Sequence, residues 1–223
     1  MDLTNAQMDA LVRGRCSRPH DLLGVHPVRD KGESRYVFRA FVQHARSCEV
    51  VDVTGGEDQR YPLKKIHKAG LFEGVVPRPD RFSYRLRLAL DNGEIRQFYD
   101  PYAYLPTLSE QDLYLFNEGT ELQIYEKLGS HPRTIDGVPG VSFAVWAPNA
   151  QRVSVVGDFN HWDGRYHPMR ILGSSGVWEL FIPGLSIGIK YKYEILGRDN
   201  HIRLKTDPYA TYFEPPPHNA AVV

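Results

Sequence analysis

The chain of 223 residues contains an internal repeat, which constrains its fold more than any other feature. Residues 23–27 (LGVHP) recur as residues 128–132 (LGSHP), at an offset of 105. Residues 100–103 (DPYA) return as residues 207–210, at an offset of 107, and further matched blocks lie between these two. A drift of only two residues along the repeat predicts two tandem copies of one domain of about 85 residues, with small changes in loop length.

Each copy shows the alternation of apolar and polar residues that is typical of strands buried on one side. In the second copy, Ile189, Tyr191, Tyr193 and Ile195 alternate with charged residues, and the first copy repeats this pattern over residues 82–90. Short turns containing Gly, Pro, Asn or Asp separate such runs. The pattern predicts an all-β chain of two tandem immunoglobulin-like β-sandwich domains.

Two short helices are predicted to flank these domains. Thr4 and Gln7 have the spacing of a capping box before an apolar stripe. Between the copies, Ser109 can cap a second helix that Gly119 would close.

The second helix sets the expected division of the chain. We expect one β-sandwich domain in residues 1–108 and a second in residues 109–223. Residues 214–218 (EPPPH) are predicted to be extended, because proline fixes φ and has no N–H to donate. We interpret this tail as a linker that leads to another part of the protein.

Charge and cysteine content limit the classes of partner. Lys plus Arg and Asp plus Glu both number 27, so the formal net charge is zero, which argues against nucleic acid or an anionic membrane as a partner. Cys16 and Cys48 are interpreted as free thiols in a reducing compartment. No apolar run approaches the ~18 residues of a membrane helix, and the first ten residues lack a basic signal-peptide region. We expect a cytoplasmic protein.

Motifs for catalysis and metal binding are missing from the sequence. It has no HExxH, CxxC, glycine-rich phosphate loop or Gly-x-Ser-x-Gly elbow. His161 and His167 flank a turn, and no third metal ligand is evident. Asp158 and Asp163 each adjoin a glycine, which is typical of turns rather than of paired catalytic carboxylates. We predict no catalytic residue, no metal site and no cofactor.

The two copies differ most at residues 157–163 (GDFNHWD) of the second copy. Asn160 aligns with Gly55, and Trp162 aligns with an acidic residue, so a scaffold common to both copies cannot require them. The flat face of an indole suits the apolar face of a sugar ring, and Asn160 and Lys192 carry groups that hydrogen bond hydroxyls. Trp162, Asn160 and Lys192 are therefore the candidate sugar-binding residues. The alternative is that Trp162 packs in the core.

The other two tryptophans have a different setting. Trp146 and Trp178 lie within strand patterns and align with Phe41 and Phe72 of the first copy. Because the first copy has aromatic residues at both places, we predict that these two tryptophans belong to the core.

The second copy also carries a longer pattern. It closely resembles the carbohydrate-binding module of bacterial 1,4-α-glucan (glycogen) branching enzymes in residues 145–150 (VWAPNA), 157–162 (GDFNHW), 176–184 (GVWELFIPG) and 205–210 (KTDPYA). The first copy is similar to the extra N-terminal domain of the longer bacterial members. Isoamylases and trehalose-forming relatives share part of the pattern, but the doubled N-terminal arrangement favours the branching enzymes.

The resemblance implies an α-glucan partner, such as glycogen or amylose-type chains, with Trp162 as the stacking residue. Members of the family cleave α-1,4 linkages and form α-1,6 branches by a retaining mechanism, in a (β/α)₈ barrel that follows the module. The sequence stops at Val223, about where this barrel would begin. We therefore expect the glucan-binding part of a branching enzyme, with the catalytic barrel as its partner and no branching activity alone.

Two other functions stay open at this point. The chain could be a free-standing glycogen- or starch-binding module, or a structural scaffold in which neither copy touches sugar. Related regulatory glycogen-binding modules carry a second tryptophan in the hairpin that follows, where this sequence has residues 198–201 (RDNH). The resemblance therefore does not supply a second stacking residue.

Overall fold

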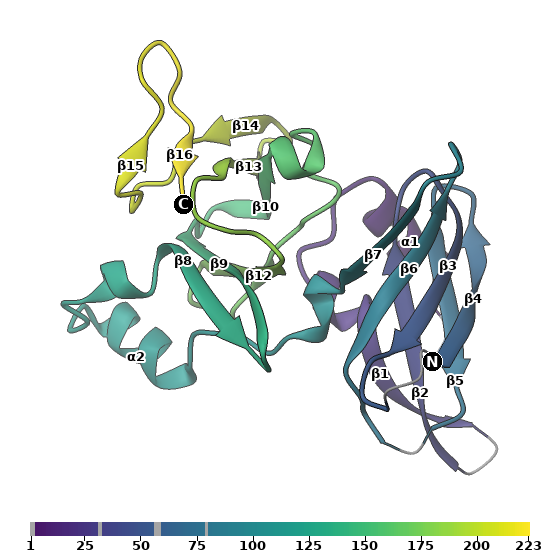
Figure 1. Ribbon diagram of the computed structural model, residues 1–223. Helices are drawn as coiled ribbons and strands as arrows, with labels where there is room; N and C mark the ends of the chain where they lie inside the picture. The colour runs from purple at the N-terminus through teal and green to yellow at the C-terminus, as the bar shows by residue number, and fades with distance from the viewer. Residues whose placement is uncertain (1–2, 31–32, 56–58, 79) are drawn as a thin grey trace. The chain divides into compact units, whose positions relative to one another are not determined.

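The computed structural model describes residues 3–30, 33–55, 59–78 and 80–223 (Figure 1). The chain divides into two compact units. The N-terminal unit comprises the residues up to Arg13 together with His20–Ala103, and the C-terminal unit comprises Gly14–Pro19 and Tyr104–Val223. Each unit is built from antiparallel strands, and the predicted all-β sandwich fold is confirmed.

The N-terminal unit begins with α1 (Asn5–Val12), whose capping box is formed by Thr4 and Gln7 as predicted. Its strands pair in the order β1-β2-β5-β4-β3-β6-β7. Strand β4 pairs with β5 near one end and with β3 near the other, so it passes from one layer to the next. The strand bounds are β1 (Gly24–Asp30), β2 (Glu33–Phe41), β3 (Ala45–Asp52), β4 (Gln59–His67), β5 (Leu71–Val76), β6 (Tyr84–Leu90) and β7 (Ile95–Tyr99).

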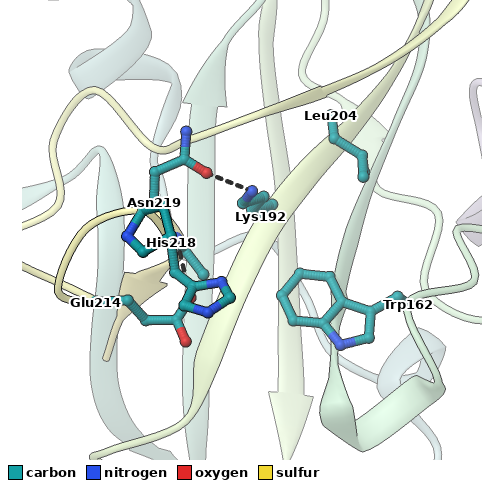
Figure 2. A pocket seen from close by; sticks show the side chains of 8 residues that line it. Trp162, Lys192, Leu204, Glu214, His218 and Asn219 are labelled. Atoms are coloured by element: carbon teal, nitrogen blue, oxygen red, sulfur yellow. Dashed lines mark hydrogen bonds between the residues drawn. The ribbon is translucent and has the colours of Figure 1, made fainter.

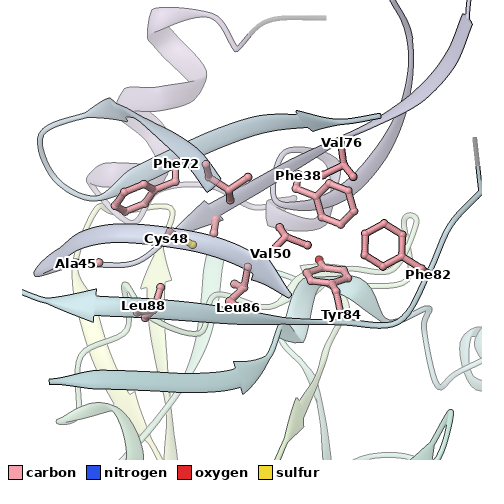
Figure 3. Packing of buried hydrophobic residues seen from close by; sticks show 12 residues of the cluster. Phe38, Ala45, Cys48, Val50, Phe72, Val76, Phe82, Tyr84, Leu86 and Leu88 are labelled. Carbon is pink, nitrogen blue, oxygen red and sulfur yellow. The ribbon is translucent and has the colours of Figure 1, made fainter. Parts of the chain in front are cut away.

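The core of this unit lies between the two layers (Figure 3). Phe38 from β2 and Phe72 from β5 face Val50 from β3 and Leu86 from β6, and all four side chains are buried. The Phe38 ring meets the Tyr84 ring edge to face, with 4.9 Å between the ring centroids. The alternating residues predicted to face inward are those that fill this space.

The C-terminal unit contains α2 (Glu110–Glu118), which Ser109 caps and which ends at Gly119 in the left-handed conformation. Two sheets follow, with strand orders β11-β12-β9-β8 and β10-β13-β16-β15, and β14 also pairs with β13. The strand bounds are β8 (Gly129–Ile135), β9 (Val138–Trp146), β10 (Ala150–Gly157), β11 (Arg170–Ile171), β12 (Val177–Pro183), β13 (Lys190–Gly197), β14 (Ile202–Lys205), β15 (Tyr212–Phe213) and β16 (Ala221–Val222).

The two units repeat the same local contacts, as expected for copies of one domain. The Nε2 atom of His26 lies 2.9 Å from the Leu23 carbonyl oxygen, and His131 makes the same contact with Leu128 at 2.9 Å. In both units this contact closes the turn that leads into the first strand. The shared LGxHP segment therefore has one structural role, used twice.

A buried carboxylate is the second shared feature. Tyr84 donates a hydrogen bond to Asp100 at 2.7 Å in the N-terminal unit, and Tyr191 donates one to Asp207 at 2.6 Å in the C-terminal unit. Burial raises the pKa of Asp100 to about 6 and also raises the pKa of Asp207, because a low-dielectric interior disfavours the charged form. The DPYA segments thus anchor the end of each copy to the strand that carries this tyrosine, β6 or β13.

The C-terminal tail folds into a hairpin, which corrects the prediction that residues 214–218 are extended. After Phe213 the chain turns through the proline run and returns as β16, which pairs with both β15 and β13. Ala220 and Ala221 are buried, and the prolines occupy the turn, where no N–H is needed for pairing. We call residues 212–222 the C-terminal hairpin. It folds back because the first part of β13 offers a free edge next to β14.

Trp146 corrects a second prediction, whereas Trp178 is buried as expected. Trp146 is 53% exposed, and its Nε1 atom donates to the Ser175 carbonyl at 3.2 Å. It is the last residue of β9 and lies on the outer face of its sheet, opposite Val177. The edge-to-face contact with Phe116 of α2 covers only part of the ring.

Candidate functional site

The loop after β10 is organised around one buried amide. The Asn160 side chain is 2% exposed, and its Oδ1 atom accepts the Gly157 N–H at 2.9 Å. Its Nδ2 group donates to the Val155 carbonyl at 2.9 Å and lies 2.9 Å from Nδ1 of His167. A sugar therefore has no access to this amide, and the prediction that Asn160 contacts sugar hydroxyls is wrong. Asn160 instead fixes the shape of the loop, because buried polar groups bond inward.

His167 completes this inner network. Burial lowers the pKa of His167 to about 4, so the imidazole is neutral at pH 7. A neutral ring can present Nδ1 as an acceptor to the Asn160 amide, whereas a protonated ring has only donors. The loop geometry is therefore coupled to the neutral form of His167.

Trp162 follows directly in a constrained backbone. His161 and Trp162 have φ values of 57° and 58°, in the left-handed region that non-glycine residues rarely adopt. The Trp162 N–H donates to the Gly157 carbonyl at 3.0 Å, which holds this turn. Its Nε1 atom donates to Asp158 Oδ1 at 2.8 Å. Because this bond and the backbone fix the partly exposed ring, Trp162 presents its flat apolar surface rather than packing in the core.

A groove of about 420 Å³ opens beside this ring (Figure 2). Figure 2 shows the indole directed toward Lys192 on β13, with the C-terminal hairpin on the far side. The hairpin contributes more than half of the lining, which comprises Trp162, Lys192, Leu204, Glu214, Pro217, His218, Asn219 and Ala220.

Three polar contacts hold the hairpin wall in place. The Lys192 ammonium donates to Asn219 Oδ1 at 2.5 Å, and Thr206 Oγ1 donates to the Asn219 carbonyl at 2.8 Å. Lys190 forms an ion pair with Glu214 at 2.7 Å. The groove thus combines one flat aromatic wall with a polar wall of ammonium, amide and carboxylate groups. This combination suits a neutral ligand with an apolar face and a hydroxylated edge.

The structure brings two of the three predicted residues, Trp162 and Lys192, into one groove and places Asn160 beneath it. Sequence reasoning missed Glu214, His218 and Asn219 because it assigned their segment to a linker. A signal was present, since the proline run is followed by the apolar residues 220–223. A turn between two short runs that can pair is typical of a hairpin.

Neither a metal-binding cluster nor a membrane-spanning helix occurs among the described residues. Within the described part of the chain, no group of three or more His, Cys, Asp or Glu side chains could hold a metal ion. No described helix combines the length and apolarity needed to cross a membrane.

Comparison with known families agrees with this arrangement. Residues 127–210 match the model of carbohydrate-binding module 48 (isoamylase N-terminal domain). Residues 4–102 match the model of the N-terminal domain of alpha-1,4-glucan branching enzyme GlgB. The C-terminal unit therefore contains a carbohydrate-binding module of class 48, which a second β-sandwich precedes.

Whole-chain relatives make the assignment more specific. The chain is 46% identical to the 1,4-alpha-glucan branching enzyme GlgB of Thermosynechococcus vestitus, over all of this chain and 29% of that protein. It is 46% identical to GlgB of Rhodospirillum rubrum and 48% identical to GlgB 2 of Streptomyces coelicolor, covering 96% of this chain and 29% and 28% of those proteins. The chain spans less than a third of these curated relatives. Together with the two family models, these relatives show that the chain is similar to the N-terminal region of GlgB branching enzymes.

Proposed function

We propose that the groove between Trp162 and the C-terminal hairpin binds linear α-1,4-linked glucan, such as glycogen or amylose-type chains. The observation that supports this most directly is the fixed, partly exposed indole of Trp162, whose N–H is already bonded to Asp158. The ring can therefore stack on the apolar face of a glucose unit without leaving its own donor unpaired.

The polar wall supplies the hydrogen bonds for the sugar edge. The Lys192 ammonium has three N–H donors, and the bond to Asn219 uses one of them. The Asn219 side chain lines the groove and is oriented by that bond. Lys192 and Asn219 would together hold vicinal hydroxyls, while Asn160 acts beneath them as a positioning residue.

The role in the cell follows from the family. We infer that the chain positions glucan for a branching enzyme, which cleaves α-1,4 linkages and forms α-1,6 branches in a catalytic (β/α)₈ barrel. No residue of this chain is assigned to that chemistry, so the chain alone is expected to be inactive. Cys16 and Cys48 are buried and form no disulfide, which supports a reducing compartment such as the cytoplasm.

Affinity electrophoresis in gels that contain glycogen tests the binding site. We expect retardation of the parent chain and a loss of affinity of about tenfold or more in Trp162→Ala, because a buried aromatic contact is typically worth more than 1.4 kcal/mol. Trp146→Ala is the matched control, since Trp146 is exposed but lies on another part of the unit. Unretarded parent chain, or equal retardation of parent and Trp162→Ala, would contradict the proposal.

A second assay tests the absence of catalysis. Incubation of amylose with the chain alone should leave its iodine colour unchanged. A fall in that colour would show branching or cleavage by these residues and would overturn the inferred division of labour.

A further inference from the structure

The face of the sheet that bears Lys192 continues past the groove onto β15. Strand β16 pairs with β13 so that Val222 lies opposite Lys190, and β15 pairs with β16 so that Tyr212 lies opposite Val222. Directly opposed residues of antiparallel strands share one face of a sheet. Lys190, Val222 and Tyr212 therefore form a row across three strands.

This row adjoins the floor of the groove. Side chains alternate along a strand, so Lys190 and Lys192 share a face, as do Tyr212 and Glu214. Lys192 and Glu214 both line the groove, and the Lys190–Glu214 ion pair at 2.7 Å joins the two rows. From standard strand geometry, the Tyr212 row lies about 7 Å along the strands from the groove floor, and β15 lies about 10 Å from β13.

Trp162 and Tyr212 stand on opposite sides of β13. The Trp162 loop follows the end of β10, where Gly157 pairs with Tyr191, whereas Tyr212 lies two strands away on the other side. Tyr212 is 66% exposed. A tyrosine ring offers a flat apolar surface at a low entropic cost, and its hydroxyl remains at the rim.

We propose that Tyr212 is a second sugar-stacking residue, so that one linear α-1,4-glucan chain runs from Trp162 across Lys192 and Glu214 to Tyr212. This inference rests on the proposed function and extends it, because it makes binding depend on chain length. The Lys190–Glu214 pair lies between the two rings and offers both donors and acceptors to hydroxyls.

The position of Tyr212 also accounts for a feature of the sequence. Residues 198–201 (RDNH), where related regulatory modules carry a second tryptophan, follow Gly197, which pairs with Ala150 at the end of β13 far from Trp162. The second ring in this chain instead comes from the hairpin. The sugar chain would therefore cross β13 toward β16, away from the β13–β14 turn.

NMR titrations of the 223-residue chain with maltose and with maltoheptaose test the proposal. Maltose is too short to reach both rings, whereas maltoheptaose is long enough. We expect Tyr212→Ala to weaken maltoheptaose binding about fivefold and to leave maltose binding within about twofold, and Tyr212→Phe to bind both like the parent, since the ring is retained. Tyr114→Ala, at a tyrosine of α2 that is 61% exposed, should change neither affinity.

The outcomes separate this inference from the function on which it rests. Equal maltoheptaose affinity of Tyr212→Ala and the parent would overturn the role of Tyr212 and leave the Trp162 groove intact. An equal loss of both sugars in Tyr212→Ala would overturn it as well, because the defect would then be a displaced hairpin; a lowered melting temperature would accompany that result. If the parent chain binds neither sugar, the proposed function itself fails.

Discussion

The two units place different loops at the end of the same strand. In the N-terminal unit, β3 ends at Asp52, whose carboxylate accepts the Thr54 N–H at 2.8 Å and pairs with Arg78. In the C-terminal unit, β10 ends at Gly157, and the Asn160 amide ties the following loop inward. Both copies keep this strand paired with the tyrosine-bearing strand, β6 or β13, but the loop after it differs. The proposed binding site is therefore formed by segments that differ between the two copies.

A second difference concerns the segment after the shared DPYA motif. In the C-terminal unit, this segment returns as the C-terminal hairpin and supplies one wall of the groove. In the N-terminal unit, the motif is followed by the start of the other unit. Glu57, which aligns with Trp162, lies outside the described residues. The two copies thus share the buried carboxylate and differ in everything proposed to touch sugar.

The largest expected effect comes from removal of the amide that organises the binding loop. Asn160→Ala should destabilise the C-terminal unit by about 3–4 kcal/mol and abolish glycogen binding, because it leaves the buried Gly157 N–H and Val155 carbonyl without partners. Urea unfolding followed by tryptophan fluorescence measures this, since all three tryptophans lie in the C-terminal unit.

The aligned position in the other copy provides the control. Gly55→Ala should change stability by less than about 0.5 kcal/mol, because an added Cβ at this exposed glycine meets nothing within 4 Å. Wild-type stability of Asn160→Ala would show that the two loops do not differ as described.

The buried carboxylate predicts a pH dependence in the N-terminal unit. The folded pKa of Asp100 is about 6, against 3.8 for the free group, so the folded state binds more protons between these values. Stability should therefore fall by about 3 kcal/mol as the pH rises from 4 to 6 and stay level above that. Asp100→Asn should remove this fall and keep an acceptor for Tyr84.

Hydrogen exchange of β6 amides, compared between parent and variant at each pH, measures this effect within the N-terminal unit. Asp207→Asn is the matched change in the other copy. It should likewise reduce the loss of stability of the C-terminal unit with rising pH, measured by urea unfolding with tryptophan fluorescence. An unchanged β6 protection profile in Asp100→Asn would contradict the prediction.

His167 predicts the opposite pH response in the C-terminal unit. Its folded pKa of about 4 lies below the free value of 6.5, so the unfolded state takes up a proton first as the pH falls. This unit should lose about 3 kcal/mol between pH 6.5 and 4 through this residue. His167→Asn, which keeps an acceptor for Asn160, should reduce that loss. Urea unfolding of the parent and of His167→Asn, followed by tryptophan fluorescence, measures this effect. An equal loss of stability between pH 6.5 and 4 in the two proteins would contradict the prediction.

The smallest expected effect comes from Lys192 on β13, compared with Arg85 at the equivalent position on β6. Lys192 pairs with Val156 on β10, and Arg85 pairs with Val51 at the same register in the N-terminal unit. Lys192→Met should weaken glycogen binding about fivefold, the equivalent of about 1 kcal/mol for a lost hydrogen-bonding group, whereas Arg85→Met should have no effect. Equal migration of the two variants in glycogen gels would remove Lys192 from the site.

Much of the fold could be predicted because it depends on local pattern. The capping boxes at Thr4 and Ser109 and the buried row Tyr191–Tyr193 are set by residues close together in the chain. The sequence also identified Trp162 as a candidate binding residue, because the aligned position of the first copy has an acidic residue instead. The repeat added information that a single copy would lack, because each position could be compared with its counterpart.

Other features were decided by the tertiary structure. Trp146 and Trp178 have similar sequence surroundings, but the strand register places them on opposite faces of their sheet. Trp178 faces the interior of the sandwich and is buried, whereas α2 covers only part of Trp146 on the outer face. The direction of the Asn160 amide depended on Val155 and His167, which lie on either side of it in the sequence and meet only in the folded loop.

The sequence by itself determined two copies of one β-sandwich, the ends of their helices and the tryptophan that distinguishes the second copy. These follow from periodicity, capping and alignment, which are properties of the chain read in order. Only the tertiary structure decided that the tail folds back on β13 and forms the second wall of the groove. The physical reason is that a strand edge is completed by whichever segment reaches it, and that partner is set by the assembled sheet rather than by neighbouring residues.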